Sequence, residues 1–201
     1  MEIKNLCFFG ESGAGKTTAA DIAVKLLRPH YSVIRCDVAT PLREIQNFCR
    51  KIFDLPNSGN PRKPTSFASD GELLSFLAQH FEPYLAPTFV KRYNEHVDLL
   101  LTTQARRDSS SLQKTIFINA DCRNNSYDLL KKLGFTFIKV CTPPEIRKGR
   151  TQQRDLTPFA SNPAELISNI EPTYCLNNET TKLAFEEHIK LLLIRMELIK
   201  D

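Results

Sequence analysis

The stretch Gly10-Glu11-Ser12-Gly13-Ala14-Gly15-Lys16-Thr17 decides the fold of this 201-residue chain. It fits the pattern G-x-x-x-x-G-K-[ST] of a phosphate-binding loop, or P-loop. The apolar run Ile3 to Phe9 precedes it and is typical of a buried strand, and Thr17 to Leu27 follows it with apolar residues at helical spacing. Only 7 residues of the chain are Gly and three of them lie in this loop, so the rarest backbone freedom is concentrated at one turn.

The loop predicts a site for the phosphates of a nucleotide. Its glycines let successive backbone N–H groups point at phosphate oxygens, and the N-terminus of the next helix adds its dipole. Lys16 would reach the β- and γ-phosphates of ATP, Thr17 would ligate Mg²⁺, and Thr18 could cover the α-phosphate. The expected donor-binding residues are Gly10, Ser12, Gly13, Ala14, Gly15, Lys16, Thr17 and Thr18.

Four further apolar runs predict four more strands, with helical patterns between them. Strands that alternate with helices are typical of an α/β fold. We therefore expect a P-loop NTPase-type parallel five-stranded sheet with helices on both faces, in a single domain over residues 1–201. One helix, Asn125 to Leu133, would end at Gly134. The four runs are Tyr31 to Cys36, Ile116 to Ala120, Phe135 to Cys141 and, more weakly, Thr173 to Leu176.

The segment between the second and third expected strands is too long for one crossover. We expect it to hold an inserted helical region, at about residues 38–113, that binds the acceptor. Three helices are expected there. The first has Thr40 as its N-cap, with Leu42, Ile45, Phe48 and Ile52 on one face. The other two are Asp70 to Phe81 and Thr88 to Gln104, with Pro83 and Pro87 between them.

Composition bounds the class of protein. Hydrophobic residues make up 41% and charged residues 25%, close to globular averages, which excludes disordered and fibrous classes. The 27 Lys plus Arg exceed the 23 Asp plus Glu only mildly, so we expect no stable nucleic-acid partner. The longest apolar stretch, Ile189 to Ile199, contains three charged residues and is too short for a membrane span. We expect no membrane association, and a monomer or homodimer.

The six cysteines indicate reduced thiols. No C-x-x-C pair occurs, and neither Cys nor His pairs at the spacing of a zinc finger. The N-terminal segment lacks a long apolar region, so we expect no signal peptide and a soluble, cytoplasmic protein. The four cysteines in or beside apolar runs are Cys7, Cys36, Cys122 and Cys141.

A P-loop alone does not separate kinases, GTPases, ATPases and motor modules, because all of them share it. The guanine-specific motif N-K-x-D is absent, and no D-x-x-G switch follows the third expected strand. The remaining motifs favour a small-molecule kinase.

Asp37 and Arg43 follow the second expected strand. Ligands of open α/β sheets bind beyond the carboxyl ends of the strands, so this segment should face the same crevice as the P-loop. Arg43 could clamp an acceptor phosphate, or it could be a solvated helix residue. Asp37 could act through Mg²⁺-bound water, hold a substrate hydroxyl, or cap the turn.

Asp121 and Arg123 follow the third expected strand. An apolar strand that ends in Asp is the Walker B arrangement, which places a carboxylate near Mg²⁺. Positions 121 and 123 of an extended chain point the same way, so both side chains can face the phosphates. The alternative is a surface ion pair.

Arg147, Arg150 and Arg154 follow the fourth expected strand at helical spacing, which would place them on one helix face. Such a face can be merely solvated. Beside a P-loop it favours a lid, at about residues 143–162, that neutralises charge during transfer and excludes water. Arg147 and Arg150 lie nearest the strand end.

The order of these motifs resembles the deoxynucleoside monophosphate kinases of phage and bacterial type, within the P-loop nucleoside and nucleotide kinase superfamily. The resemblance covers roughly residues 1–55 and 115–195. Residues 56–114 match poorly, and Asn124-Asn125-Ser126-Tyr127 stands where the family commonly has Phe-Pro-Asn-Glu. The matching stretches are the P-loop, Asp37-Val-Ala-Thr-Pro-Leu-Arg43, Asp121-Cys-Arg123, Leu130-Lys-Lys-Leu-Gly134, the arginine lid and Tyr174-Cys-Leu-Asn-Asn178.

The resemblance implies Mg²⁺-dependent transfer of the γ-phosphoryl group of ATP to a nucleoside monophosphate. Two alternatives stay open. One is a kinase for a hydroxyl acceptor such as dephospho-coenzyme A or a sugar, with Asp37 or Asp121 as base, and the other is a non-catalytic nucleotide-binding switch. The residues expected to act in catalysis are Lys16, Asp121, Arg123, Arg147 and Arg150; the acceptor would meet Asp37, Arg43 and Arg123; and the metal would meet Thr17 and Asp121.

Overall fold

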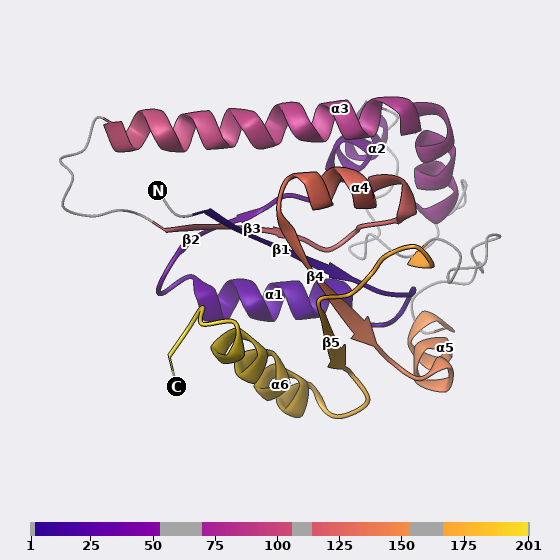
Figure 1. Ribbon diagram of the computed structural model, residues 1–201. Coiled ribbons are helices and arrows are strands. Elements are labelled where there is room, and N and C mark those ends of the chain that lie inside the picture. Colours follow the sequence, from indigo (N-terminus) through magenta and orange to yellow (C-terminus); the bar gives the residue numbers. More distant parts are fainter. Residues whose placement is uncertain (1–2, 53–69, 106–113, 153–166, 201) are drawn as a thin grey trace.

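A parallel sheet forms the centre of the protein in the computed structural model, which describes residues 3–52, 70–105, 114–152 and 167–200. The five strands in these ranges lie in the order β2-β3-β1-β4-β5 (Figure 1). Each predicted strand is present, with ends that differ from the prediction by at most one residue. The strands are β1 (Ile3–Phe9), β2 (Ser32–Arg35), β3 (Thr115–Asn119), β4 (Phe135–Cys141) and β5 (Tyr174–Asn177).

β1 lies in the middle of the sheet, with β3 on one side and β4 on the other. Side chains alternate along a strand, so Leu6 and Phe8 enter the core on one face of the sheet and Cys7 and Phe9 enter it on the other. All four are buried. This burial on both faces explains why β1 is an unbroken apolar run.

Helices cover both faces of the sheet (Figure 1). On one face, α1 and α6 bury Leu27, Phe185 and Ile189 against the strands. On the other face lie α3 and α4, while α5 follows the end of β4. The expected α/β fold is therefore confirmed. The described helices are α1 (Lys16–Leu27), α2 (Thr40–Ile52), α3 (Asp70–Ala105), α4 (Asn124–Lys132), α5 (Pro144–Gln152) and α6 (Lys182–Arg195).

α3 is one continuous helical element, whereas the sequence predicts two helices with a break at Pro83 and Pro87. That prediction is wrong. A proline removes one backbone hydrogen bond and crowds the preceding turn, which can bend a helix without ending it. In Figure 1 the element changes direction after its first turns and then runs over the sheet. Phe89 and Tyr93 belong to this second part of α3, and both are buried in the core. Their packing stabilises the helical conformation beyond both prolines.

α4 agrees with the sequence, and the lid expected at about residues 143–162 stays a prediction. Gly134 follows the last turn of α4 at φ 76°, the left-handed conformation that ends a helix. α5 covers the lid region as far as Gln152, whereas Arg154 and the remainder up to residue 162 lie outside the described residues. The single-domain boundaries and the acceptor-binding role of residues 38–113 stay predictions.

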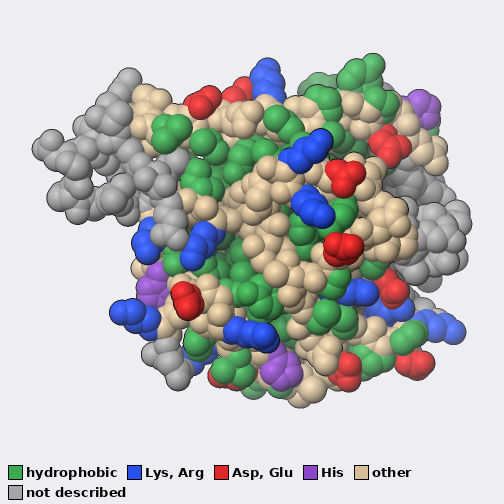
Figure 2. All heavy atoms as spheres, viewed as in Figure 1, with side chains coloured by type: hydrophobic (Ala, Val, Ile, Leu, Met, Phe, Trp, Pro, Cys, Tyr) green, Lys and Arg blue, Asp and Glu red, His purple; other side chains and the backbone are tan. Residues whose placement is uncertain are grey.

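All six cysteines are free. Cys7 and Cys122 are buried, Cys36 and Cys141 are partly buried, and Cys175 is exposed. None of the helices in the described ranges has the length and apolar character to cross a bilayer. On the face seen in Figure 2, Lys and Arg side chains are interspersed with Asp and Glu.

Two glycines outside the P-loop should respond oppositely to the same substitution. Gly149 lies inside α5, and a Cβ there would meet nothing within 4 Å, so Gly149→Ala should stabilise the helix by about 0.5–1 kcal/mol. Gly134 also has open space around it, but its positive φ should make Gly134→Ala cost about 1–2 kcal/mol. Urea unfolding of each full-length variant measures both changes, and shifts in the same direction would contradict the assignment.

Candidate functional site

The P-loop turns through positive backbone angles at three glycines. Their φ values are 149° at Gly10, 79° at Gly13 and 96° at Gly15, and residues other than glycine rarely adopt such angles. The space is also closed. A Cβ at Gly10 would lie 2.5 Å from the carbonyl oxygen of Val140, and a Cβ at Gly15 would lie 2.3 Å from Nδ2 of Asn178. The turn therefore fits directly against the ends of β4 and β5 only because these side chains are absent.

The loop leads into α1 without a capping side chain. Gly15 is the N-cap, and its carbonyl oxygen accepts the first helical hydrogen bond, from Ala19 at 2.8 Å. The first N–H groups of a helix have no acceptor within it, and Gly15 has no side-chain oxygen to offer them. Together with the positive end of the helix dipole, these N–H groups suit an anion such as a phosphate.

Lys16 folds back over the loop. Its Nζ donates a hydrogen bond to the carbonyl oxygen of Glu11 at 2.9 Å. The pKa of Lys16 is lowered from 10.5 to about 8, mainly by burial and also by the positive charges of Arg123 and Arg147, whereas Asp121 and Glu11 act in the opposite direction. The positive charges near Lys16 therefore outweigh the negative charges, and an anionic ligand would reduce the repulsion between these cations.

Two residues that the sequence reasoning did not assign to the site fasten the loop to the sheet. Nδ2 of Asn178 donates to the carbonyl oxygen of Ala14 at 2.8 Å, and the hydroxyl of Thr142 lies 3.0 Å from the same oxygen. Asn178 is buried. Both residues directly follow strands of the sheet, and polar side chains at the carboxyl ends of parallel strands were the available signal.

The two arginines of α5 lie beside the P-loop. Nε of Arg147 donates to the carbonyl oxygen of Thr142 at 3.1 Å, and its guanidinium forms an ion pair with Glu11. Nη1 of Arg150 lies 3.5 Å from the carbonyl oxygen of Gly13 and its Nη2 lies 3.4 Å from Oδ1 of Asn178. The structure thus places both arginines next to the loop, and their part in phosphoryl transfer stays a prediction.

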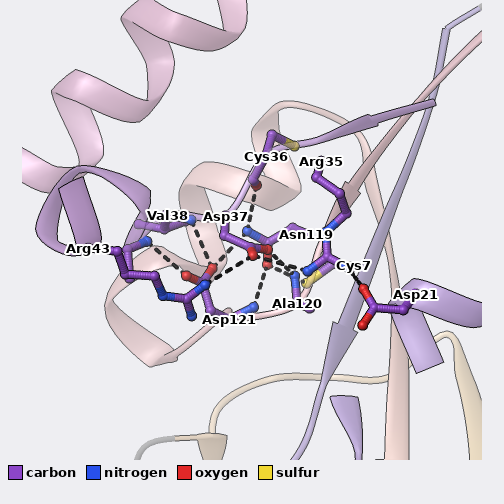
Figure 3. A network of polar contacts seen from close by, with 11 residues as sticks. Cys7, Asp21, Arg35, Cys36, Asp37, Val38, Arg43, Asn119, Ala120 and Asp121 are labelled. Carbon is purple, nitrogen blue, oxygen red and sulfur yellow. Dashed lines mark hydrogen bonds and ion pairs between the residues drawn. The ribbon is translucent and has the colours of Figure 1, made fainter. Parts of the chain in front are cut away.

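A second cluster joins the ends of β2 and β3 (Figure 3). Oδ1 of Asp37 accepts the N–H of Ala120 at 2.8 Å. In return, the two carboxylate oxygens of Asp121 accept the N–H groups of Val38 and Ala39, each at 2.8 Å. Asn119 donates to Oδ1 of Asp121 at 3.0 Å. Each carboxylate therefore holds the backbone that follows the neighbouring strand, and this fixes the start of α2.

Asp37 also lies between two arginines. Its Oδ2 is 3.0 Å from Nη2 of Arg35 and 3.6 Å from Nη1 of Arg43 (Figure 3). Nη1 of Arg35 also forms an ion pair with Oδ1 of Asp21 at 3.1 Å. The side chain of Arg43 is half exposed, so its guanidinium can still meet a ligand. Asp37 thus serves to orient Arg43, whatever other role it has.

Burial raises the pKa of Asp121, and the negative charge of Asp37 raises it further. The N–H groups of Ala39 and Val38 and the charge of Arg43 act in the opposite direction. The two carboxylates at the ends of adjacent strands therefore repel each other, and the charge of Arg43 partly compensates this repulsion.

Arg123 connects the two clusters electrostatically. It follows Asp121 and precedes α4, and its N–H donates to Oγ of Ser126 at 3.0 Å. Burial lowers the pKa of Arg123, whereas the charge of Asp121 raises it. The charge of Arg123 also lowers the pKa of Lys16, so Arg123 interacts electrostatically with both the P-loop lysine and the Asp121 carboxylate.

The residues of the loop and its surroundings fit ATP and Mg²⁺. The glycine turn and the uncapped start of α1 suit phosphate oxygens. In the described ranges, no group of three or more His, Cys, Asp or Glu side chains could hold a metal by itself. Mg²⁺ commonly takes one or two protein ligands and completes its shell with water and substrate phosphates, so a hydroxyl and a carboxylate are suitable ligand types, and the assignment of Thr17 and Asp121 stays a prediction. Thr17 is exposed, Ser12 and Thr18 are partly buried, and the donor roles of all three stay predictions.

Comparisons with known proteins give fold-level likeness only. No family model matches the chain, and no curated protein matches it. A sugar kinase from Janibacter sp. HTCC2649 is similar at 18% identity and a TM-score of 0.48, over 98% of this chain and 95% of that one. The APS kinase of Mycobacterium tuberculosis, in complex with AMPPNP and APS, is similar at 18% identity and 0.48, over 98% of each chain. Dephospho-CoA kinase from Campylobacter jejuni is similar at 15% and 0.47, over 96% and 97%. These TM-scores are too low to support a conclusion about activity.

The ion pairs of Arg35 provide a matched stability test. Asp37 is 10% exposed and carries a backbone hydrogen bond besides its two arginines, so Asp37→Asn should cost about 1.5–3 kcal/mol of unfolding free energy. Asp21 pairs with the same arginine but is 67% exposed, so Asp21→Asn should cost less than about 1 kcal/mol. Urea unfolding at pH 7 compares them, and equal losses would refute the structural role of Asp37.

Lys16 should make stability depend on pH in the alkaline range. Its pKa is lower in the folded than in the unfolded protein, so the buried ammonium opposes folding below about pH 8, and this penalty fades as pH rises toward 10.5. Lys16→Met should therefore raise the unfolding free energy by roughly 1–3 kcal/mol at pH 7, with a smaller gain at pH 9.5.

Urea unfolding of wild type and Lys16→Met at both pH values measures this difference. The control is the substitution Lys91→Met, at a side chain that is 77% exposed, and its effect on the unfolding free energy should not follow the same trend. A gain at Lys16→Met that is equal at the two pH values would contradict the pKa assignment.

Proposed function

We propose that this chain transfers the γ-phosphoryl group of ATP, with Mg²⁺, to a small phosphorylated acceptor, and specifically to a nucleoside monophosphate. One observation carries the proposal. Lys16 lies at the end of the glycine turn, and Arg147 and Arg150 contact that turn through Glu11 and Gly13, so cations gather at a loop whose backbone geometry suits phosphate. A polyanionic ligand is the natural complement of such a site.

On the donor side, the loop glycines and the first N–H groups of α1 would hold the phosphates of ATP, and Lys16 would exchange the carbonyl oxygen of Glu11 for phosphate oxygens. The side chains of Ser12, Thr17 and Thr18 would complete the donor contacts. Thr17 and Asp121 would hold Mg²⁺, and this ion would neutralise charge on the donor when bound.

On the acceptor side, Arg43 and Arg123 would grip the acceptor phosphate, and Asp37 would orient Arg43. The helical region at about residues 38–113 would hold the rest of the acceptor. Its first helix is already fixed to the end of β3, because Asp121 accepts the N–H groups of Val38 and Ala39. Acceptor and donor would thus meet at the carboxyl ends of β1, β2 and β3.

The carboxylates of Asp37 and Asp121 already accept backbone N–H groups, which favours an acceptor that needs no general base. An oxygen of an acceptor phosphate is already charged, so it needs no strong general base, and positioning plus charge neutralisation suffice. Arg147 and Arg150 would neutralise charge on the transferring group, and the lid would exclude water. Six free thiols support a reducing compartment, such as the cytoplasm, for this activity.

A kinase for a hydroxyl acceptor is the second candidate. The raised pKa of Asp121 favours it, because such a carboxylate is a better proton acceptor at neutral pH. Against it, both oxygens of Asp121 and Oδ1 of Asp37 already accept backbone N–H groups, and Oδ2 of Asp37 faces two arginines. We therefore favour the phosphate acceptor.

The test is an acceptor screen with the purified full chain and Mg·ATP. At least one ribo- or deoxynucleoside monophosphate should produce ADP above the ATP-only control. Lys16→Ala should lower kcat/KM by at least about 100-fold, since it removes a charge at the transferring phosphate. Lys132→Ala, at an exposed position in the last turn of α4 and outside the proposed acceptor region, should retain wild-type turnover.

The other outcomes separate the alternatives. ADP formed only with dephospho-coenzyme A, sugars or other hydroxyl acceptors would establish the second candidate. ATP binding by calorimetry without turnover on any acceptor would favour a nucleotide-binding switch. Unimpaired turnover in Lys16→Ala would refute the P-loop assignment itself.

A further inference from the structure

Glu11 contacts two cations of the site at once. Its carboxylate forms an ion pair with the guanidinium of Arg147, which belongs to α5. Its backbone carbonyl accepts the hydrogen bond from Nζ of Lys16 at 2.9 Å. One residue of the loop thus holds positive groups from two different helices.

Arg147 is fixed from two directions. Its Nε donates to the carbonyl oxygen of Thr142 at 3.1 Å, and Nη2 faces Oε2 of Glu11. The side chains of Arg147 and Glu11 are 19% and 30% exposed, so water screens this pair less than a surface ion pair. Thr142 in turn lies against the carbonyl oxygen of Ala14, so the contacts connect α5 to the loop through backbone and side chain.

Keeping these cations together without a ligand has an electrostatic cost. The charges of Arg123 and Arg147 lower the pKa of Lys16, whereas the charge of Glu11 raises it. The carboxylate of Glu11 therefore offsets part of the repulsion between Lys16 and the arginines. Arg147 belongs to α5, a helix of 9 residues that follows the end of β4, so loss of the Glu11 charge would act on the position of that helix.

We propose that Glu11 is a positioning residue that holds Arg147, and with it α5, against the phosphate loop before nucleotide binds. The inference rests on the proposed function, since it assigns the contact to the arginine that would neutralise the transferring group. Glu11 acts through Arg147 and does not itself touch the reacting atoms.

Two opposite effects follow from this role. The charge of Glu11 repels the phosphates of an incoming nucleotide, so its removal strengthens binding. The same charge places Arg147, so its removal weakens transfer. A residue that served only the fold would lower binding and turnover together, or change neither.

The first test uses hydrogen exchange of the nucleotide-free full chain, and it does not depend on any activity. Glu11→Gln should speed exchange of the backbone in residues 144–152 at least about threefold. Arg147→Ala should have the same effect, and the double variant should show no further increase. Glu179→Gln removes an equal charge at an exposed residue next to Asn178 and should match wild type. Unchanged exchange in Glu11→Gln would overturn the proposal.

The second test is a kinetic double-mutant cycle with the acceptor found in the screen. Glu11→Gln should lower kcat about tenfold while the Kd for ATP falls or stays constant. In the Arg147→Ala background the same substitution should leave kcat unchanged, because the residue through which Glu11 acts is gone. Additive losses in kcat would overturn the proposal, provided that all variants keep the wild-type melting temperature within a few degrees.

Glu11→Asp covers the case in which Glu11→Gln unfolds. It keeps the charge but shortens the side chain by one methylene, so exchange in residues 144–152 should fall between wild type and Arg147→Ala.

The proposed function and the proposed role of Glu11 can fail independently of each other. An absence of turnover on every acceptor would remove the proposed function, yet faster exchange of α5 in Glu11→Gln would still establish the contact as the one that holds α5.

Discussion

The close fit of the glycine turn against the ends of β4 and β5 is the constraint on which the rest of the site depends. A Cβ at Gly10 would collide with the backbone oxygen of Val140, which cannot yield as a side chain would. The carbonyl oxygen of Ala14 is bound by Asn178 and lies within reach of Thr142. These contacts fix the direction in which α1 begins, and hence where its first N–H groups and Lys16 point. α5 follows directly from the end of β4, so this fit also determines where Arg147 and Arg150 lie relative to the loop.

The carboxylates show how one residue can serve both the fold and the chemistry. Asp37 and Asp121 each accept backbone N–H groups that follow the neighbouring strand, so removing either one would loosen the crevice as well as change its charge. A loss of activity on substituting Asp121 would therefore not by itself assign a base or a metal ligand. The stability comparison between Asp37 and Asp21 addresses the structural share of such effects directly.

The sequence was a good guide to whatever depends on local pattern. The strand before Gly10, the helix after it and the stop at Gly134 are set by burial on both faces and by backbone angles that only glycine adopts readily. It failed at α3, because the packing of Phe89 and Tyr93 against distant strands outweighs the local effect of the prolines. The contacts of Asn178 and Glu11 also escaped it, since each joins residues far apart in the chain and no spacing rule reports them.

Charge balance links these parts to the proposed chemistry. Burial is the main cause that lowers the pKa of Lys16 to about 8, and the charges of Arg123 and Arg147 contribute in the same direction. Phosphates placed beside Lys16 would favour its charged form and raise that pKa. Above about pH 8, phosphate binding must then be accompanied by proton uptake, and affinity must fall as the pH rises. The arrangement that gathers cations for an anionic transition state therefore also ties nucleotide binding to the protonation of one lysine.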